Sequence, residues 1–151
     1  MNEYVWLKFF HILIAIIALG TSAGLGIVME FYGDHPVHGL FVLRAVKRLV
    51  AFVVIPGYLL MVVTGLWLTH DAWSFTFRWI QTALVLWVLG AVAFAGSLVL
   101  LNKQIELFEA SGPTSTSYKR VSLLGRFFGG ASGLIILIIV YLMVAKPSLS
   151  W

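Results

Sequence analysis

The sequence predicts an all-α membrane protein, in which residues 1–151 form a single four-transmembrane-helix bundle. Hydrophobic residues make up 61% of the 151 residues and charged residues only 11%, whereas a soluble domain carries about 25% charged residues. So few charges cannot cover the large surface of a small soluble domain, which excludes the soluble and the disordered classes. Four apolar stretches are also long enough to cross a bilayer, which takes about 20 apolar residues.

The predicted spans cover residues 4–29, 49–69, 79–101 and 128–145. The last span is slightly short, but residues 121–127 can extend it. The first apolar run continues past the small residues that would form a signal-peptide cleavage site. We therefore expect the first run to be retained as a helix.

The basic residues predict the orientation of the spans. Most of them lie in the first and third loops, namely Arg44, Lys47, Arg48, Lys103, Lys119, Arg120 and Arg126. The excess of positive charge makes these two loops cytoplasmic and places both termini outside. In a bacterium this describes a multi-pass protein of the cytoplasmic (inner) membrane. The partner of these basic residues is then the lipid bilayer with its anionic headgroups, and no nucleic acid.

The cytoplasmic loops are expected to extend the helices. Pro36 suits the first turn of a helix, with Asp34 or His35 as its cap. Residues 102–110 are polar but compatible with a helix, and a Gly-Pro pair then breaks the chain before a stretch of capping residues. The result is two helical hairpins with cytoplasmic helix extensions.

Helical periodicity, at about 100° per residue, divides each span into an inner and a lipid-facing side. On the first helix the polar and small side should face other helices, because ionisable groups are costly in hydrocarbon. The expected inner residues are Tyr4, Lys8, His11, Ala15, Ala18, Ser22 and Met29 on the first helix; Gly57, Met61, Thr64 and Gly65 on the second; Gln81, Val88, Val92, Ala95 and Gly96 on the third; and Gly130, Gly133, Leu137 and Tyr141 on the fourth. Gly20 and Gly24 form a G-x-x-x-G on the opposite side of the first helix, which offers a dimer face.

His11 is the most informative residue, because it lies about seven residues, or roughly 10 Å, inside the outer end of its helix. A histidine that faces a bundle interior, with small neighbours and a basic rim, suits a b-type haem whose iron the imidazole would ligate. The other candidate cofactor-binding residues are Met61, Gln81 and Tyr141 in the outer half, and Lys8 and Arg78 at the outer rim, where they would meet the propionates.

Purely structural roles for the same residues remain alternatives. His11 can be a structural histidine that bonds to Tyr141, Gln81 or a backbone carbonyl, and Met61 can simply fill the core. His70 is a candidate second axial ligand, although a histidine beside Asp71 at the end of a span is commonly interfacial. Without a second ligand the haem would be five-coordinate or water-ligated.

A second histidine pair lies near the cytoplasmic end of the first span. His35 and His38 form an H-x-x-H next to Glu30 and Asp34, which is compatible with copper or zinc. The alternative is a capped, solvated helix start.

The absence of cysteine excludes several kinds of chemistry. Disulfides, thiol catalysis, cysteine-ligated metals and a covalently attached c-type haem all need cysteine, and the sequence has none. Nucleophile-elbow, P-loop and H-E-x-x-H motifs are also missing. The carboxylates lie outside the spans or at their ends, which argues against a proton relay through the bilayer.

Two stretches carry a family resemblance: "YVWLKFFHILIAIIALG" and "IPGYLLMVVTGLWLTHDAWSFTFRWIQTALVLW". They resemble a four-helix predicted integral membrane family of unknown function, DUF2269. They are also similar to the membrane protoporphyrinogen oxidase family HemJ and the copper-resistance family CopD. The HemJ resemblance implies a b-type haem and an oxidoreductase, with Trp6, Lys8 and His11 matching the W-L-K-x-x-H stretch that carries its histidine. The functional lysine of that family corresponds to Gln81 here, and a neutral amide cannot supply its positive charge, which weighs against porphyrinogen oxidation.

Three functional hypotheses follow from the sequence. The first is a haem-binding membrane protein with a redox or electron-transfer role and His11 as axial ligand. The second is a non-catalytic accessory or assembly subunit that docks on a larger membrane complex or forms a homo-oligomer. The third is a transporter of copper, as the CopD resemblance implies, or of another small solute. Because four helices make a narrow bundle, transport would require an oligomer.

Overall fold

The computed structural model describes residues 3–147, which form helices and no strand. The elements in chain order are α1 (Glu3–Tyr32), α2 (Gly39–Leu49), the π-helical turn η1 (Val50–Val54), α3 (Ile55–Ala72), α4 (Arg78–Ser111) and α5 (Thr116–Ala145). Because α2, η1 and α3 follow one another without a break, the described chain contains four helical rods that are long and apolar enough to cross a membrane. The predicted all-α, four-helix membrane fold is confirmed.

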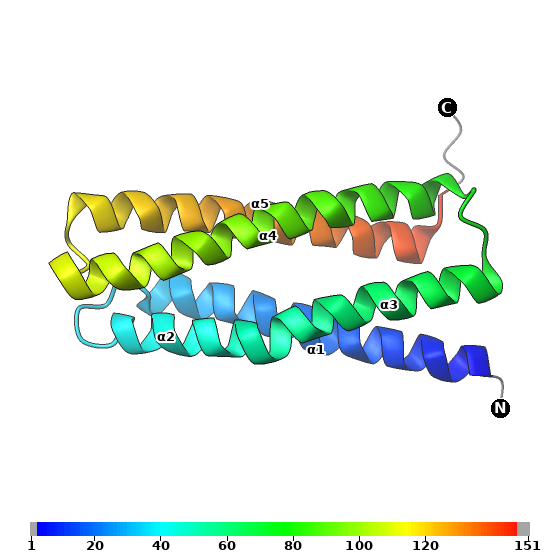
Figure 1. The fold of residues 1–151 in the computed structure, drawn as a ribbon, viewed down its shortest axis with the longest axis horizontal. Coiled ribbons are helices and arrows are strands. Elements are labelled where there is room, and N and C mark those ends of the chain that lie inside the picture. The colour runs from blue at the N-terminus through cyan, green and yellow to red at the C-terminus, as the bar shows by residue number, and fades with distance from the viewer. Residues whose placement is uncertain (1–2, 148–151) are drawn as a thin grey trace.

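The four rods form two antiparallel hairpins (Figure 1). In the first hairpin α1 lies along α2 and α3, and in the second α4 lies along α5. The start of α1, the α3–α4 connection and the end of α5 share one end of the bundle, which we call the terminal end. There the Lys146 ammonium lies 4.2 Å from the ring centroid of Trp73. The opposite end carries the other two connections and most of the basic residues, and we call it the basic end.

The two hairpins contact each other mainly at the basic end. There α2 packs on α4, whereas the backbones of no other pair of described helices from different hairpins approach each other closely over more than a few residues. The buried core cluster lies in the same region and consists of Leu43, Val46, Val50, Val54, Leu101, Phe108 and Tyr118. In Figure 1 the ribbons of α2 and α4 lie close together at the basic end, whereas those of α3 and α4 stay apart. The arrangement of the hairpins therefore depends on contacts at the basic end.

The start of α2 differs from the prediction. The helix begins at Gly39, so Pro36 lies in the preceding turn and not in the first helical turn. His35 does act at this turn, because its Nδ1 accepts hydrogen bonds from two backbone N–H groups that follow it, both at 3.2 Å. Asp34 does not cap the helix, because its carboxylate is held by α5. A polar partner distant in the sequence thus overrides the local capping preference.

A π-helical turn joins α2 to α3 directly before Pro56. The backbone N–H of Ile55 donates to the carbonyl of Val50, five residues earlier, instead of the usual four. Pro56 has no N–H to donate, and its ring crowds the carbonyl four residues before it, so a widened turn at this point accommodates the ring. The helix therefore continues through the proline.

The second hairpin follows the prediction closely. The polar residues 102–110 do continue α4, which ends at Ser111 before Gly112 takes up a positive φ of 74°. Ser115 then caps α5, with its hydroxyl accepting a hydrogen bond from the backbone N–H of Tyr118 at 3.3 Å. The fourth span is consequently longer than its apolar core of residues 128–145.

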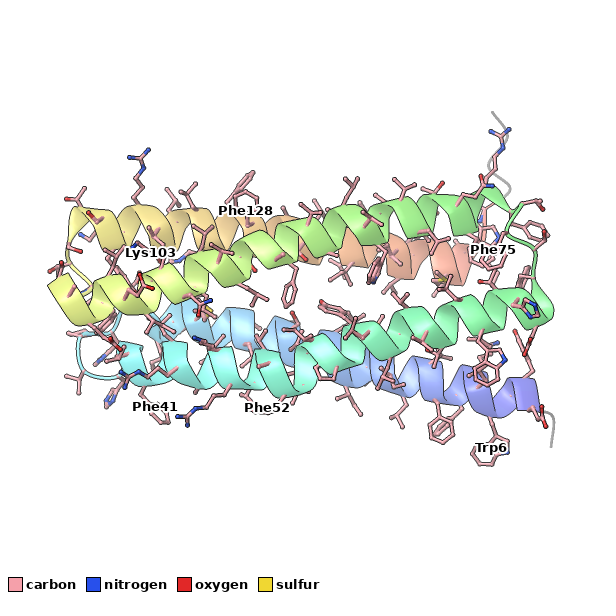
Figure 2. All side chains as sticks on the ribbon, viewed as in Figure 1. Trp6, Phe41, Phe52, Phe75, Lys103 and Phe128 are labelled. Atoms are coloured by element: carbon pink, nitrogen blue, oxygen red, sulfur yellow. The ribbon has the colours of Figure 1, made fainter. Side chains whose placement is uncertain are left out.

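Apolar side chains point outward all along the bundle, as Figure 2 shows for Trp6, Phe52 and Phe128. Such a surface belongs in lipid. The inner side predicted for the third helix is wrong, because Val88 and Val92 are 54% and 66% exposed. Instead Trp87, Ala91 and Phe94 line a cavity between the hairpins. Apolar residues surround this helix almost completely, so their periodicity could not fix its rotation.

Candidate functional site

His11 on α1 faces α3, as predicted, and its Nδ1 lies 2.7 Å from the Thr64 hydroxyl oxygen. That hydroxyl donates to the carbonyl of Leu60 at 2.7 Å, with the carbonyl of Met61 as a longer alternative at 3.2 Å. A hydroxyl has a single hydrogen, so once it donates to the backbone it can only accept from the imidazole. We therefore assign the proton of His11 to Nδ1, which leaves a lone pair on Nε2.

Small residues of α3 make room for the histidine. A Cβ atom on Gly65 would lie 3.2 Å from Cε1 of His11, and a Cβ atom on Gly57 would lie 2.6 Å from Cβ of Ala18. The absence of these two Cβ atoms lets α1 approach α3 closely, with the imidazole half-buried between them. We call this contact the His11 seam.

The structure does not gather the other predicted cofactor residues around His11. Met61 is half-buried one turn before Thr64, and Lys8 is exposed on α1. The exposed side chain of Gln81 donates to the carbonyl of Phe75 at 3.0 Å. Two more candidates are exposed on the second hairpin: Arg78, and Tyr141 with 64% of its surface accessible. Within residues 3–147, His11 has one side-chain hydrogen bond, the one with Thr64.

His70 lies outside the His11 seam. Its side chain is 81% exposed, and its Nδ1 lies 3.2 Å from the carboxylate of Asp71. His70 follows Gly65 by five residues, which places it about 140° around the helix axis from the glycine that the imidazole covers. The geometry therefore favours the interfacial interpretation of His70 over a second axial ligand.

The rings of His35 and His38 are stacked, with their centroids 4.8 Å apart. Nδ1 of His35 is occupied by backbone N–H groups, so this ring would have only Nε2 left for a metal. No group of three or more histidine, aspartate or glutamate side chains that could hold a metal occurs among residues 3–147. The geometry favours a solvated turn before α2 that His35 stabilises, although no side chain caps the helix itself.

A buried polar network, which the sequence analysis missed, ties the two hairpins together at the basic end. Its centre is Tyr118, fully buried, whose hydroxyl lies 2.8 Å from the Gly33 carbonyl and 2.9 Å from the Asp34 carboxylate and accepts from the Gln104 amide at 3.0 Å. Arg126 donates to Asp34 at 2.6 Å and to Glu30 at 3.2 Å.

We call this network the polar clamp; its members are Glu30, Gly33, Asp34, Gln104, Tyr118, Ser122 and Arg126. The signal for it was present in the sequence. Two carboxylates follow the first span, and an arginine precedes the apolar part of the fourth, so antiparallel hairpins bring their charges to the same end.

Two cavities lie between the hairpins. The smaller, of about 170 Å³, is bounded by α3, α4 and α5, and the larger, of about 470 Å³, lies between α1 and α5. Both are lined by Tyr58, Phe94, Ser132 and Ile136, which therefore separate them. His11 lines neither cavity, so the His11 seam is a separate place in the fold.

Comparison with known proteins identifies a family and no individual relative. Residues 5–147 match a family described as "Predicted integral membrane protein (DUF2269)". The chain has no significant match among curated proteins or solved structures. The likeness to HemJ and CopD therefore still depends only on the residues quoted above. Since the match covers nearly the whole chain, this protein belongs to the DUF2269 family of integral membrane proteins.

Proposed function

We propose that the protein binds a b-type haem through His11 and serves as a redox component of the membrane. The supporting observation is the contact of the imidazole with α3: Nδ1 lies 2.7 Å from the Thr64 hydroxyl oxygen. In the tautomer assigned above, Thr64 anchors Nδ1–H and Nε2 keeps its lone pair. Metal-ligating histidines commonly have their other ring nitrogen anchored in this way, which fixes the ring orientation and raises the basicity of the ligand. Haem, when bound, supplies one-electron chemistry.

The residues present fit a haem with one protein ligand. His11 would hold the iron, Thr64 would orient the imidazole, and Lys8, exposed one turn away, would pair with a propionate. No second histidine joins the seam, so the chain offers a five-coordinate site. Neither of the two cavities between the hairpins reaches His11, so a haem held there would lie at the seam and not in either cavity.

Visible absorption of the protein purified from haem-replete cells tests the proposal. We expect a Soret band that shifts on dithionite reduction and disappears in His11→Ala. Thr64→Val should retain the band but weaken haem binding by about 10-fold to 100-fold, the usual effect of losing such an anchor. His70→Ala is the matched control, because it removes an exposed imidazole, and its spectrum should be unchanged. A colourless protein that gives no pyridine haemochrome refutes the proposal.

A second candidate function, an accessory subunit that docks laterally in the membrane, is favoured by the G-x-x-x-G of α1. A Cβ atom on Gly20 or Gly24 would meet nothing within 4 Å, so packing within the chain does not explain these glycines. Close approach of another transmembrane helix would explain them. In that case cross-linking in native membranes should report a homo-oligomer or a larger complex that Gly20→Leu disrupts.

The transporter hypothesis gains least from the geometry, since His35 and His38 provide two stacked rings and residues 3–147 add no third ligand. Elemental analysis tests it directly. Bound copper that is lost when both histidines are replaced would favour it over the two functions above.

A further inference from the structure

We propose that the larger cavity between the hairpins binds a neutral, elongated apolar molecule of the membrane that carries a carbonyl oxygen, and that Tyr58 donates a hydrogen bond to this oxygen. Prenyl quinones are the chemical class that combines these features. The inference is independent of haem, because the cavity does not include His11.

The cavity has the size and the walls of a small-molecule site. Its volume of about 470 Å³ falls within the range of about 300–1,000 Å³ that is common for ligand pockets. One wall comes from α1 and includes Gly26, and the facing wall comes from α5 and includes Gly129, Gly130 and Gly133.

A Cβ atom on any of these four glycines would meet nothing within 4 Å. Glycine inside a helix costs about 1 kcal/mol relative to alanine. Contacts within the chain do not explain that cost at these positions, but a ligand lying against the bare backbone would.

Tyr58 provides an independent observation. Its hydroxyl oxygen is buried, and although the Ser22 side chain of α1 lies near it, the two form no hydrogen bond of good geometry. Within residues 3–147 this is the one buried side-chain nitrogen or oxygen left unpaired. The Tyr58 ring meets Phe94 of the opposite hairpin edge to face, with ring centroids 5.3 Å apart, and both rings line the cavity. A phenol hydroxyl left unpaired in this way favours any ligand that presents an acceptor oxygen.

The depth of Tyr58 distinguishes a carbonyl-bearing apolar molecule from a phospholipid. Tyr58 lies 9 residues after Leu49 and 11 before Thr69, so it sits about 14–16 Å from each end of the span, near the middle of a hydrocarbon core about 30 Å thick. The ester carbonyls of a phospholipid lie at the interface, and its acyl chains cannot accept a hydrogen bond. A phospholipid in the cavity would therefore leave the Tyr58 hydroxyl unpaired.

The charges around the cavity favour a neutral ligand. Arg126 lines its basic end but is already paired with Glu30 and Asp34. Two carboxylates for one guanidinium leave no positive charge free for an anionic headgroup. The other polar side chains along the walls are neutral, namely Ser22, Ser97, Gln104 and Ser132 in addition to Tyr58.

The test uses the full-length protein in nanodiscs of zwitterionic lipid, with decylubiquinone as the probe. The quinone retained per protein is measured by chromatography after extraction, relative to empty nanodiscs. We expect saturable retention. Tyr58→Phe should weaken it about five-fold, the value of one neutral hydrogen bond, and Gly133→Leu, which fills the cavity, should abolish it. The matched controls, Tyr141→Phe and Ala95→Leu, change an exposed hydroxyl and an exposed small residue outside the cavity, and they should bind like the wild type.

Several outcomes overturn the inference. Retention no greater than in empty nanodiscs rejects the ligand class. Equal affinity of the wild type and Tyr58→Phe rejects the hydrogen bond. A phospholipid that stays bound to both proteins in native mass spectrometry after release from the nanodisc would then identify the cavity as a lipid groove. Tyr58→Phe is conservative enough to keep the protein monodisperse, so the test does not depend on Gly133→Leu. The Soret band reports the His11 proposal separately in the same samples.

Discussion

Replacing Tyr118 with phenylalanine tests the polar clamp most directly. The substitution keeps the ring but removes the hydroxyl, which leaves the Gln104 amide and the Gly33 carbonyl without this partner in a buried place. Asp34 retains its bond to Arg126. With about 1–3 kcal/mol for each buried group left unpaired, and partial relaxation of the site, we expect Tyr118→Phe to lower the free energy of unfolding by about 2–4 kcal/mol.

Steric trapping in bicelles measures this free energy in a lipid environment. Tyr141→Phe is the matched control, because its hydroxyl is on an exposed ring with no side-chain hydrogen bond within the described residues, so it should change stability by less than about 0.5 kcal/mol. A loss below about 0.5 kcal/mol in Tyr118→Phe as well would refute the view that the clamp holds the hairpins together.

A double variant, Tyr118→Phe with Gln104→Leu, measures how much the hydrogen bond between these two side chains contributes to stability. Gln104→Leu removes the amide that Tyr118→Phe leaves unpaired, and replacing both partners with apolar groups is close to neutral. The double variant should therefore be more stable than Tyr118→Phe alone. If the two losses simply add, the hydrogen bond between these side chains contributes nothing to stability.

Two further predictions concern helix packing and surface charge. Gly57→Ala should destabilise the first hairpin by about 1–3 kcal/mol in the same trapping assay, because the new methyl group would overlap Ala18. Gly24→Ala, which meets no neighbour, should be neutral or slightly stabilising. Equal effects of the two substitutions would contradict the close α1–α3 contact. Arg44→Ala should lower the free energy of unfolding by at most about 1 kcal/mol, because the ion pair between Arg44 on α2 and Glu109 on α4 is about half exposed. A larger loss would mean that this ion pair helps the polar clamp to hold the hairpins together.

The fold was predictable from the sequence because bilayer thickness and charge placement constrain it strongly. Long apolar runs specify the spans, and the polar continuation of α4 and the cap at Ser115 follow from residue type alone. The inward orientation of His11 was predictable for a related reason. On an otherwise bulky, apolar helix, its side is the one that carries the small and polar residues.

The rotation of α4 and the polar clamp were not predictable in the same way. Apolar residues surround α4 on nearly every side, so Val88 and Val92 gave no signal that they face lipid. The clamp joins side chains about 90 positions apart, such as Asp34 and Arg126, and their pairing depends on how far each helix extends beyond the bilayer. The unpaired hydroxyl of Tyr58 is a property of three-dimensional packing and has no counterpart in sequence periodicity.

The widened turn at Val50–Val54 takes up one residue more than a regular α-helical turn and so determines the rotation of α3 about its axis. Leu43 and Val46 hold the preceding helix in the core, so any change of helical phase must appear in α3. If the turn closed to regular α-helical spacing with all its residues kept, everything after it would rotate by about 100° about the helix axis. Thr64 would then lose its alignment with His11, and the hydroxyl of Tyr58 would leave its place between the hairpins. The extra residue in this turn therefore determines which way Thr64 and Tyr58 face, and with them the geometry of both candidate sites.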